Sequence, residues 1–145
     1  MNGSALPIRV ELALRAAGMY AWSWDSESRL VACTRSAQEI LGLAPGPLRR
    51  PLSVYERLVL AVDRPLVTAT TEQALSGAKT PLEATFRIAL PTSGAHRWLT
   101  ARGRVHRDEM TGHMTVAGVL WQTTARRSTA NVMHHFLDVI CSSWQ

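Results

Sequence analysis

The side chains best able to do chemistry in this chain are histidines and cysteines, and their spacing argues against an enzyme. They are Cys33, His96, His106, His113, His134, His135 and Cys141. His134 and Asp138 share one helical face at i, i+4, but two ligands do not make a closed metal site, so a solvated face is the simpler interpretation. The sequence shows no nucleophile–base arrangement and no glycine-rich phosphate loop. We therefore expect neither catalysis nor a metal centre.

The cysteines indicate a reducing compartment. Cys33 and Cys141 lie far apart in apolar surroundings, which is not the pattern of a disulfide framework or a C-x-x-C site. No apolar run is long enough to span a membrane, and three charged residues interrupt the first 20 residues, unlike a signal peptide. We expect a cytoplasmic protein with no membrane partner.

The charge of the chain raises the question of nucleic acid. The formal net charge is +5 and the pI about 10.2, and Lys79 is the only lysine among 16 basic residues. The arginines are scattered, and no helix-turn-helix or zinc-finger spacing accompanies them. A soluble arginine-rich surface is the interpretation we adopt, and an arginine-rich nucleic-acid-binding transcription regulator is the alternative.

The elements that must position these side chains begin with a helix and a strand pair. Residues 5–17 repeat apolar positions every three to four residues, which predicts an amphipathic helix that ends at Gly18. Large rings alternate with small or polar residues over 20–25, which predicts a strand with one buried face. Residues 30–33 are expected to return as its hairpin partner.

Short helices are expected next. Ser36 and Glu39 have the spacing of a capping box at the start of a helix. Three prolines in 44–51 predict a loop, and residues 52–61 a short helix. Asp63 is the expected N-cap of a longer helix, with proline in its first turn.

The second half of the chain changes to the period of a strand. Apolar residues occupy alternate positions in 82–90, 96–105 and 114–121, with short turns between them. Strands joined in this way pair as an antiparallel meander. Residues 128–144 return to a helical repeat.

This order of elements, with its motifs, resembles the PAS family, in particular a subtype with a W-x-W-D start. The resemblance covers residues 17–127, and its pieces are Trp22-Ser23-Trp24-Asp25, Ser36–Leu43, Asp63–Gly77, Phe86–Ile88, Gly94–Leu99 and Gly118–Arg127. It implies an α+β fold, with a five-stranded antiparallel sheet, short helices on one face and flanking N- and C-terminal helices. It also implies a sensor module in signal transduction.

Three positions depart from the family pattern. Leu60-Ala61-Val62-Asp63 stands where H-P-D-D is frequent, and Ser93-Gly94 where D-G is usual. Gln122 replaces the Asp of the closing D-I-T segment. Because members with that Asp resemble modules that feed a kinase or cyclase, its loss weighs against the standard output.

The resemblance implies two cofactors to test against the residues. Haem-binding members use a His on the long helix, and residues 63–77 contain none. Light-sensing members use a reactive Cys in an N-C-R-F-L motif, which is absent, and Cys33 falls in a strand. We expect no cofactor. A flavin- or haem-dependent sensor is the alternative, and it leaves room for a non-covalently held flavin.

Two sets of apolar residues are candidate contact sites. A cavity between the sheet and the helices would be lined by Trp22, Trp24, Leu58, Phe86, Ile88 and Trp98. Their alternative role is ordinary core packing. The resemblance implies a dimer built by the terminal helices, with candidates Leu6, Val10, Leu14, Phe136, Ile140 and Trp144. Packing within the monomer is the alternative for these residues.

The whole pattern predicts an N-terminal helix at 1–18, a PAS domain at 19–127 and a C-terminal helix at 128–145. We expect a stand-alone, non-catalytic sensor or adaptor that acts as a homodimer by contact with a protein partner. A small apolar ligand in the core would gate it.

Overall fold

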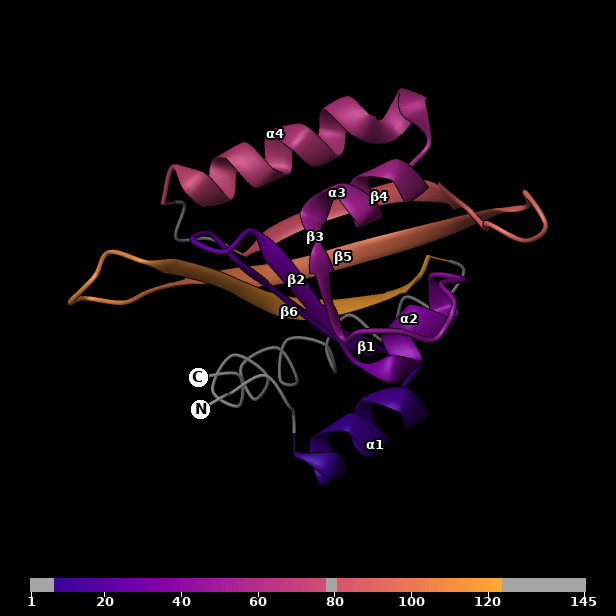
Figure 1. The fold of residues 1–145 in the computed structure, drawn as a ribbon, viewed down its shortest axis with the longest axis horizontal. Helices are drawn as coiled ribbons and strands as arrows, with labels where there is room; N and C mark the ends of the chain where they lie inside the picture. Colours follow the sequence, from indigo (N-terminus) through magenta and orange to yellow (C-terminus); the bar gives the residue numbers. More distant parts are fainter. Residues whose placement is uncertain (1–6, 78–80, 124–145) are drawn as a thin grey trace.

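The computed structural model of the chain describes residues 7–77 and 81–123. One antiparallel sheet of six strands, in the order β3-β2-β1-β6-β5-β4, organises this part of the chain (Figure 1). The strands are β1 Tyr20–Asp25, β2 Leu30–Cys33, β3 Arg49–Pro51, β4 Leu82–Ala89, β5 His96–Arg107 and β6 Met114–Gln122. This confirms the expected PAS-like α+β architecture and the antiparallel meander of the second half.

The helices lie on both sides of the sheet. They are α1 Ile8–Ala16, α2 Arg35–Ile40, α3 Leu52–Leu58, the 3₁₀ turn η1 Ala61–Asp63 and α4 Arg64–Leu75. Figure 1 shows α3 and α4 over one face of the sheet, which we call the inner face, and α1 beneath the opposite, outer face. The predicted C-terminal helix at 128–145 falls outside the described residues.

Three local expectations were wrong. The expected loop at 44–51 ends in β3, which pairs with β2 as a sixth strand. The cap of α2 is Thr34, whose Oγ1 accepts a hydrogen bond from the Ala37 amide at 3.2 Å, so the helix begins before Ser36. Asp63 caps nothing with its side chain, because its carboxylate binds Arg87 of β4.

Each face of the sheet carries its own apolar cluster. Alternating side chains of β1 point to opposite faces, so Trp24 packs with Val31, Ile88 and Leu99 on the inner face. Ala21 instead lies in an outer-face cluster with Leu14, Met19 and Val119. Leu14 belongs to α1, so this cluster is where the helix packs against the sheet.

Candidate functional site

A cavity of about 180 Å³ separates the inner face from α3 and α4. It is partly open to solvent, and its walls are almost wholly apolar. The sheet contributes Trp22, Trp24, Val31, Cys33, Leu82, Ala84, Phe86, Ile88, Ala101, Gly103, Val116 and Leu120, and the helical side Leu41, Leu52, Tyr55, Glu56, Leu58, Val59, Val67, Thr70, Thr71 and Ala74.

Small residues create this space. Ala84 and Ala101 are direct cross-strand partners under α4, and Gly103 follows on the same face of β5. The helix faces them with Ala74, its one fully buried residue. Short side chains on both walls leave a void between backbones that longer side chains would have filled.

Gly103 also makes room for the ring of Trp22. A Cβ atom at this position would come within 2.9 Å of the Trp22 ring atom Cη2, so the ring occupies the place of the absent side chain. The neighbouring partner in the register is Gly118. Two glycines side by side let a large indole lie close to the sheet and form the cavity floor.

The wall from α4 offers no free hydroxyl donor. Thr70 Oγ1 and Thr71 Oγ1 donate hydrogen bonds to the carbonyl oxygens of Leu66 and Val67, each at 3.0 Å. Back-bonding of this kind commits the hydroxyl to the helix backbone.

Five of the six side chains predicted for the cavity line it: Trp22, Trp24, Leu58, Phe86 and Ile88. Trp98 does not, and that expectation was wrong. It sits between the inward-facing Arg97 and Leu99, so the alternation of β5 turns it to the outer face. There it is 46% exposed, with the Arg87 guanidinium carbon 4.8 Å from its ring centroid.

Two of the six residues predicted for a dimer interface, Val10 and Leu14, belong to the described part of the chain. Leu14 is fully buried against the outer face and Val10 packs beside it, so both take part in packing within the monomer. The apolar side chains that α1 exposes are Ile8 and Leu12, at 70% and 54%. The other candidates, Leu6, Phe136, Ile140 and Trp144, lie outside the described residues.

Sequence reasoning placed Cys33 in a strand but assigned neither Cys33 nor Tyr55 to the cavity, where both contribute polar hydrogens to the lining. Burial raises the pKa of the Cys33 thiol to about 11, although Tyr55 and Arg50 partly offset this. Burial, together with the neighbouring thiol, also raises the pKa of Tyr55. Both groups therefore keep their protons at neutral pH. Tyr55 lies on an expected helix, but no sequence signal shows which side of it faces the sheet.

Three residues of the cavity lining carry buried polar atoms that meet no hydrogen-bond partner in the described part of the chain. Within the described residues, Trp22 Nε1, Trp24 Nε1 and Tyr55 Oη are buried and have no hydrogen-bond partner. Native proteins rarely leave such atoms unpaired, and each unpaired atom calls for an explanation.

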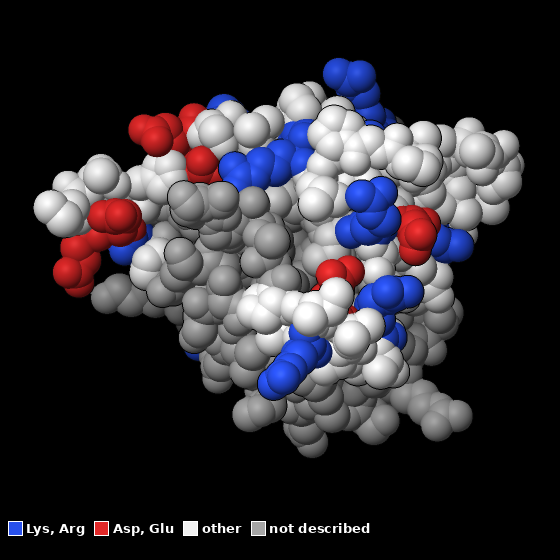
Figure 2. Space-filling model, turned by 60° about the horizontal axis from the view of Figure 1, so that its bottom comes forward, with Lys and Arg blue, Asp and Glu red and all other residues white. Residues whose placement is uncertain are grey.

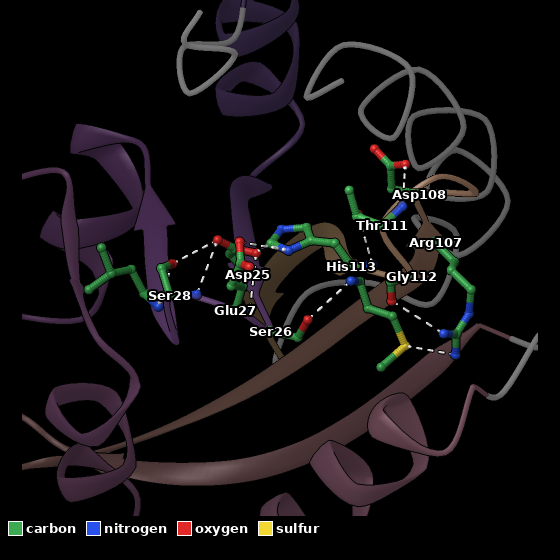
Figure 3. A network of polar contacts seen from close by, with 11 residues as sticks. Asp25, Ser26, Glu27, Ser28, Arg107, Asp108, Thr111, Gly112 and His113 are labelled. Carbon is green, nitrogen blue, oxygen red and sulfur yellow. Dashed lines mark hydrogen bonds and ion pairs between the residues drawn. The ribbon is translucent and has the colours of Figure 1, made fainter.

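A second polar cluster lies away from the cavity, where the β1–β2 turn meets the β5–β6 turn (Figure 3). His113 forms ion pairs through Nε2 with Asp25 and through Nδ1 with Glu27, the latter at 3.2 Å. Asp25 also accepts a hydrogen bond from Ser28 Oγ at 2.8 Å. Within residues 7–77 and 81–123, no group of three metal-ligating side chains is placed to hold an ion.

On the face drawn in Figure 2, basic side chains have acidic side chains among them. Several arginines are tied to the protein itself: Arg50 and Arg64 donate to backbone carbonyls, and Arg97 donates to the carbonyl of Ile40. In the described part of the chain, no helix has the length and apolarity needed to cross a membrane.

Comparison with known families agrees with this architecture. The family model described as "PAS fold" matches residues 30–120, more than half of the chain. The chain belongs to the PAS-fold family. The resemblance drawn from the sequence motifs is thereby confirmed at the level of the family.

Solved structures of several sensory proteins share the fold of this PAS domain. A sensory box histidine kinase/response regulator from Burkholderia thailandensis superposes with a TM-score of 0.66 at 19% identity, covering 88% of this chain and 93% of that one. The N-terminal domain of a diguanylate cyclase with PAS/PAC sensor from Marinobacter aquaeolei gives 0.62 at 17% identity, with 72% and 94% covered. The PAS domain of Bordetella pertussis BvgS gives 0.52 at 14% identity, with 92% and 97% covered. No curated protein sequence matches the chain.

Proposed function

We propose that this chain is a non-catalytic PAS sensor or adaptor module of signal transduction, controlled by a small apolar ligand in the cavity under α3 and α4. Family membership and the fold shared with domains of a sensory kinase and a diguanylate cyclase support a signalling role. The observation that carries the ligand is the cavity itself, about 180 Å³ of space with apolar walls.

The helical cover of this cavity is suited to respond to a ligand. α3 has no fully buried residue, and α4 has only Ala74. The apolar side chains by which they pack on the core, such as Leu52, Leu58 and Val67, are only partly buried, so displacing these helices costs less free energy than a change in the sheet. A ligand that favours one position of the cover shifts the population toward it.

Two connections carry this change toward α1. Trp22 lines the cavity and its neighbour Ala21 packs under α1, so strand β1 touches both sites. Ser36 of α2 also donates a hydrogen bond to Glu11 of α1 at 3.4 Å. We propose that α1 forms the output surface, with exposed Ile8 and Leu12 in a homodimer or protein contact in the cytoplasm.

Native mass spectrometry of the purified chain tests this proposal, because it reports subunit number and retained ligand together. We expect a dimer and an extra mass that is lost on denaturation. Ile8→Asp with Leu12→Asp should convert the dimer to monomers, and Arg9→Asp is the matched charge control on the same helix. A monomer with no retained or added ligand would refute the proposal.

A further inference from the structure

The polar atoms around the cavity favour one chemical class of ligand. This inference rests on the proposed ligand-binding function. Trp22, Trp24 and Tyr55 all line the cavity, and each has a buried polar atom without a partner among the described residues. An indole N–H only donates hydrogen bonds. Three unsatisfied groups around one void are the arrangement that a bound molecule with acceptor atoms would satisfy.

The protonation states of Cys33 and Tyr55 also favour a ligand that accepts hydrogen bonds. The raised pKa values of Cys33 and Tyr55 keep the thiol and the phenol protonated at neutral pH. Both groups therefore present a hydrogen that can be donated. The side of the cavity formed by β1, β2 and α3 is thus rich in donors.

The acidic residue of the cavity lining restricts the charge that a ligand can carry. Glu56 is the one charged side chain among the described residues that line the cavity. A carboxylate at the wall repels an anionic molecule, and apolar walls disfavour any buried ion that lacks a partner. The ligand consequently carries no negative charge.

The volume limits its size. An engineered apolar cavity of about 150 Å³ binds benzene in another protein, whereas drug-sized ligands occupy roughly 300–1,000 Å³. A cavity of about 180 Å³ thus holds one ring with a small substituent.

We propose that the cavity selects a neutral molecule of about one ring that bears a carbonyl or ether oxygen, which accepts hydrogen bonds from Tyr55 and from the indoles of Trp22 and Trp24. The two indole N–H groups are buried at the cavity lining without a hydrogen-bond partner in the described part of the chain, and the neighbour of the Tyr55 hydroxyl is the weakly hydrogen-bonding thiol of Cys33. Rotation of an indole about its broad χ2 torsion can turn Nε1 toward the ligand, whereas Tyr55 Oη lies on its own ring axis and reaches the ligand only when the whole side chain turns about χ1.

Acetophenone and cumene test this selection, because they have the same number of non-hydrogen atoms and differ mainly in the carbonyl. Each is titrated into the purified full chain by calorimetry. We expect Tyr55→Phe to weaken acetophenone binding about tenfold and cumene binding less than twofold. Trp24→Phe should show the same selective loss. Tyr20→Phe, which alters a tyrosine outside the cavity lining, should change neither affinity.

The possible results separate this inference from the proposed function. If Tyr55→Phe weakens both probes equally, or neither, the acceptor preference is wrong while ligand binding stands. If neither probe binds but native mass spectrometry shows another retained molecule, the ligand class is wrong and the sensor proposal survives. If nothing is retained and nothing binds, both fail. Because Tyr55→Phe removes a single oxygen atom, circular dichroism should confirm an unchanged fold.

Discussion

At the scale of the residue, Gly118 determines how closely β5 and β6 meet. A Cβ atom there would stand 1.8 Å from the Arg102 carbonyl oxygen and 2.6 Å from the Gly103 Cα atom. These are backbone atoms of the paired strand, so no side-chain rotation relieves the clash. Glycine is required by close approach of two backbones, not by an unusual backbone angle.

We expect Gly118→Ala to lower the free energy of unfolding by more than about 3 kcal/mol, since the strands must separate to admit the methyl group. Urea denaturation measures this change. Gly94→Ala is the control: Gly94 has φ +73 and open space around it, so strain alone should cost about 1–2 kcal/mol. Equal losses at both positions would contradict the steric account.

Asp63 is the second residue whose role depends on tertiary contact. Its carboxylate accepts hydrogen bonds from the Arg87 amide at 2.8 Å and from the Arg87 guanidinium twice at 3.0 Å. These bonds hold the pKa of the Asp63 carboxyl below its ordinary value. The pair therefore joins the start of α4 to the edge strand β4.

The depressed pKa gives a signed prediction for acid. A carboxylate with a folded pKa below its unfolded value stabilises the fold above the unfolded pKa, and this is lost as pH falls through the folded pKa. Asp63→Asn should therefore lower the melting temperature by a few degrees at pH 7, with the gap narrowing below about pH 4. Thermal melts across pH measure this, with Glu72→Gln as a charge control. A gap that stays constant down to pH 2 would refute the linkage.

At the scale of elements, the His113 cluster joins two turns that are far apart in sequence. Beside the ion pairs to Asp25 and Glu27, the Ser26 amide donates to the Met114 carbonyl at 2.9 Å. The Met114 amide returns a bond to Ser26 Oγ at 3.1 Å. The cluster holds the ends of β1 and β6 in register.

Removing this link should loosen the turns without unfolding the sheet. Exposed ion pairs contribute about 0.2–1 kcal/mol, so His113→Ala should speed hydrogen exchange of the Ser26 and Met114 amides roughly two- to fivefold. Amides in the centre of β5 should keep their rates. His96→Ala, on a strand end outside the cluster, is the control, and it should leave Ser26 and Met114 unchanged. Uniform acceleration across the sheet would instead indicate global destabilisation.

The α4 helix provides a test of the void itself. In a fully packed core, a larger side chain at a buried alanine costs about 1–3 kcal/mol, but an adjacent cavity can accommodate it. We expect Ala74→Leu to stay within about 1 kcal/mol of the parent in urea denaturation, and to abolish ligand retention. Ala69→Leu, on the exposed face of the same helix, should change neither. A loss above about 2 kcal/mol for Ala74→Leu would argue against the cavity.

At the scale of the whole molecule, the net charge of +5 makes nucleic-acid binding a question for experiment. In the described residues, some arginines are bound within the protein: Arg50 to a backbone carbonyl oxygen, Arg87 to Asp63 and Arg102 to Glu83. A phosphate-binding surface would need several side chains free to meet a repeating negative charge.

We therefore expect Kd values above about 10⁻⁴ M for duplex DNA and single-stranded RNA at low salt. This affinity is lower than that of usual non-specific binding. Fluorescence anisotropy with labelled oligonucleotides measures this, with a basic DNA-binding protein as the positive control. Micromolar binding that falls steeply with added salt would favour the regulator alternative instead.

Much of the fold is predictable because secondary structure follows local periodicity. Alternation in 82–90 and 114–121 places β4 and β6 within one residue of their ends, and the ring pattern of 20–25 matches β1. Errors arose where a distant partner decides the outcome. Arg49–Pro51 has no strand signal of its own and becomes β3 by pairing with β2.

The sequence by itself determined the strand and helix order apart from β3, and the antiparallel meander, since these follow from spacing along the chain. It named five residues that line the cavity, but left open whether they enclose a void or pack as an ordinary core. Only the tertiary structure decided that Trp98 faces outward, that Leu14 packs inward and that Asp63 meets Arg87. A period of two shows which residues share a face, but not which face the helices cover. Likewise, the space under α4 exists because Ala84, Ala101 and Gly103 come together through strand register, a relation that no single segment encodes.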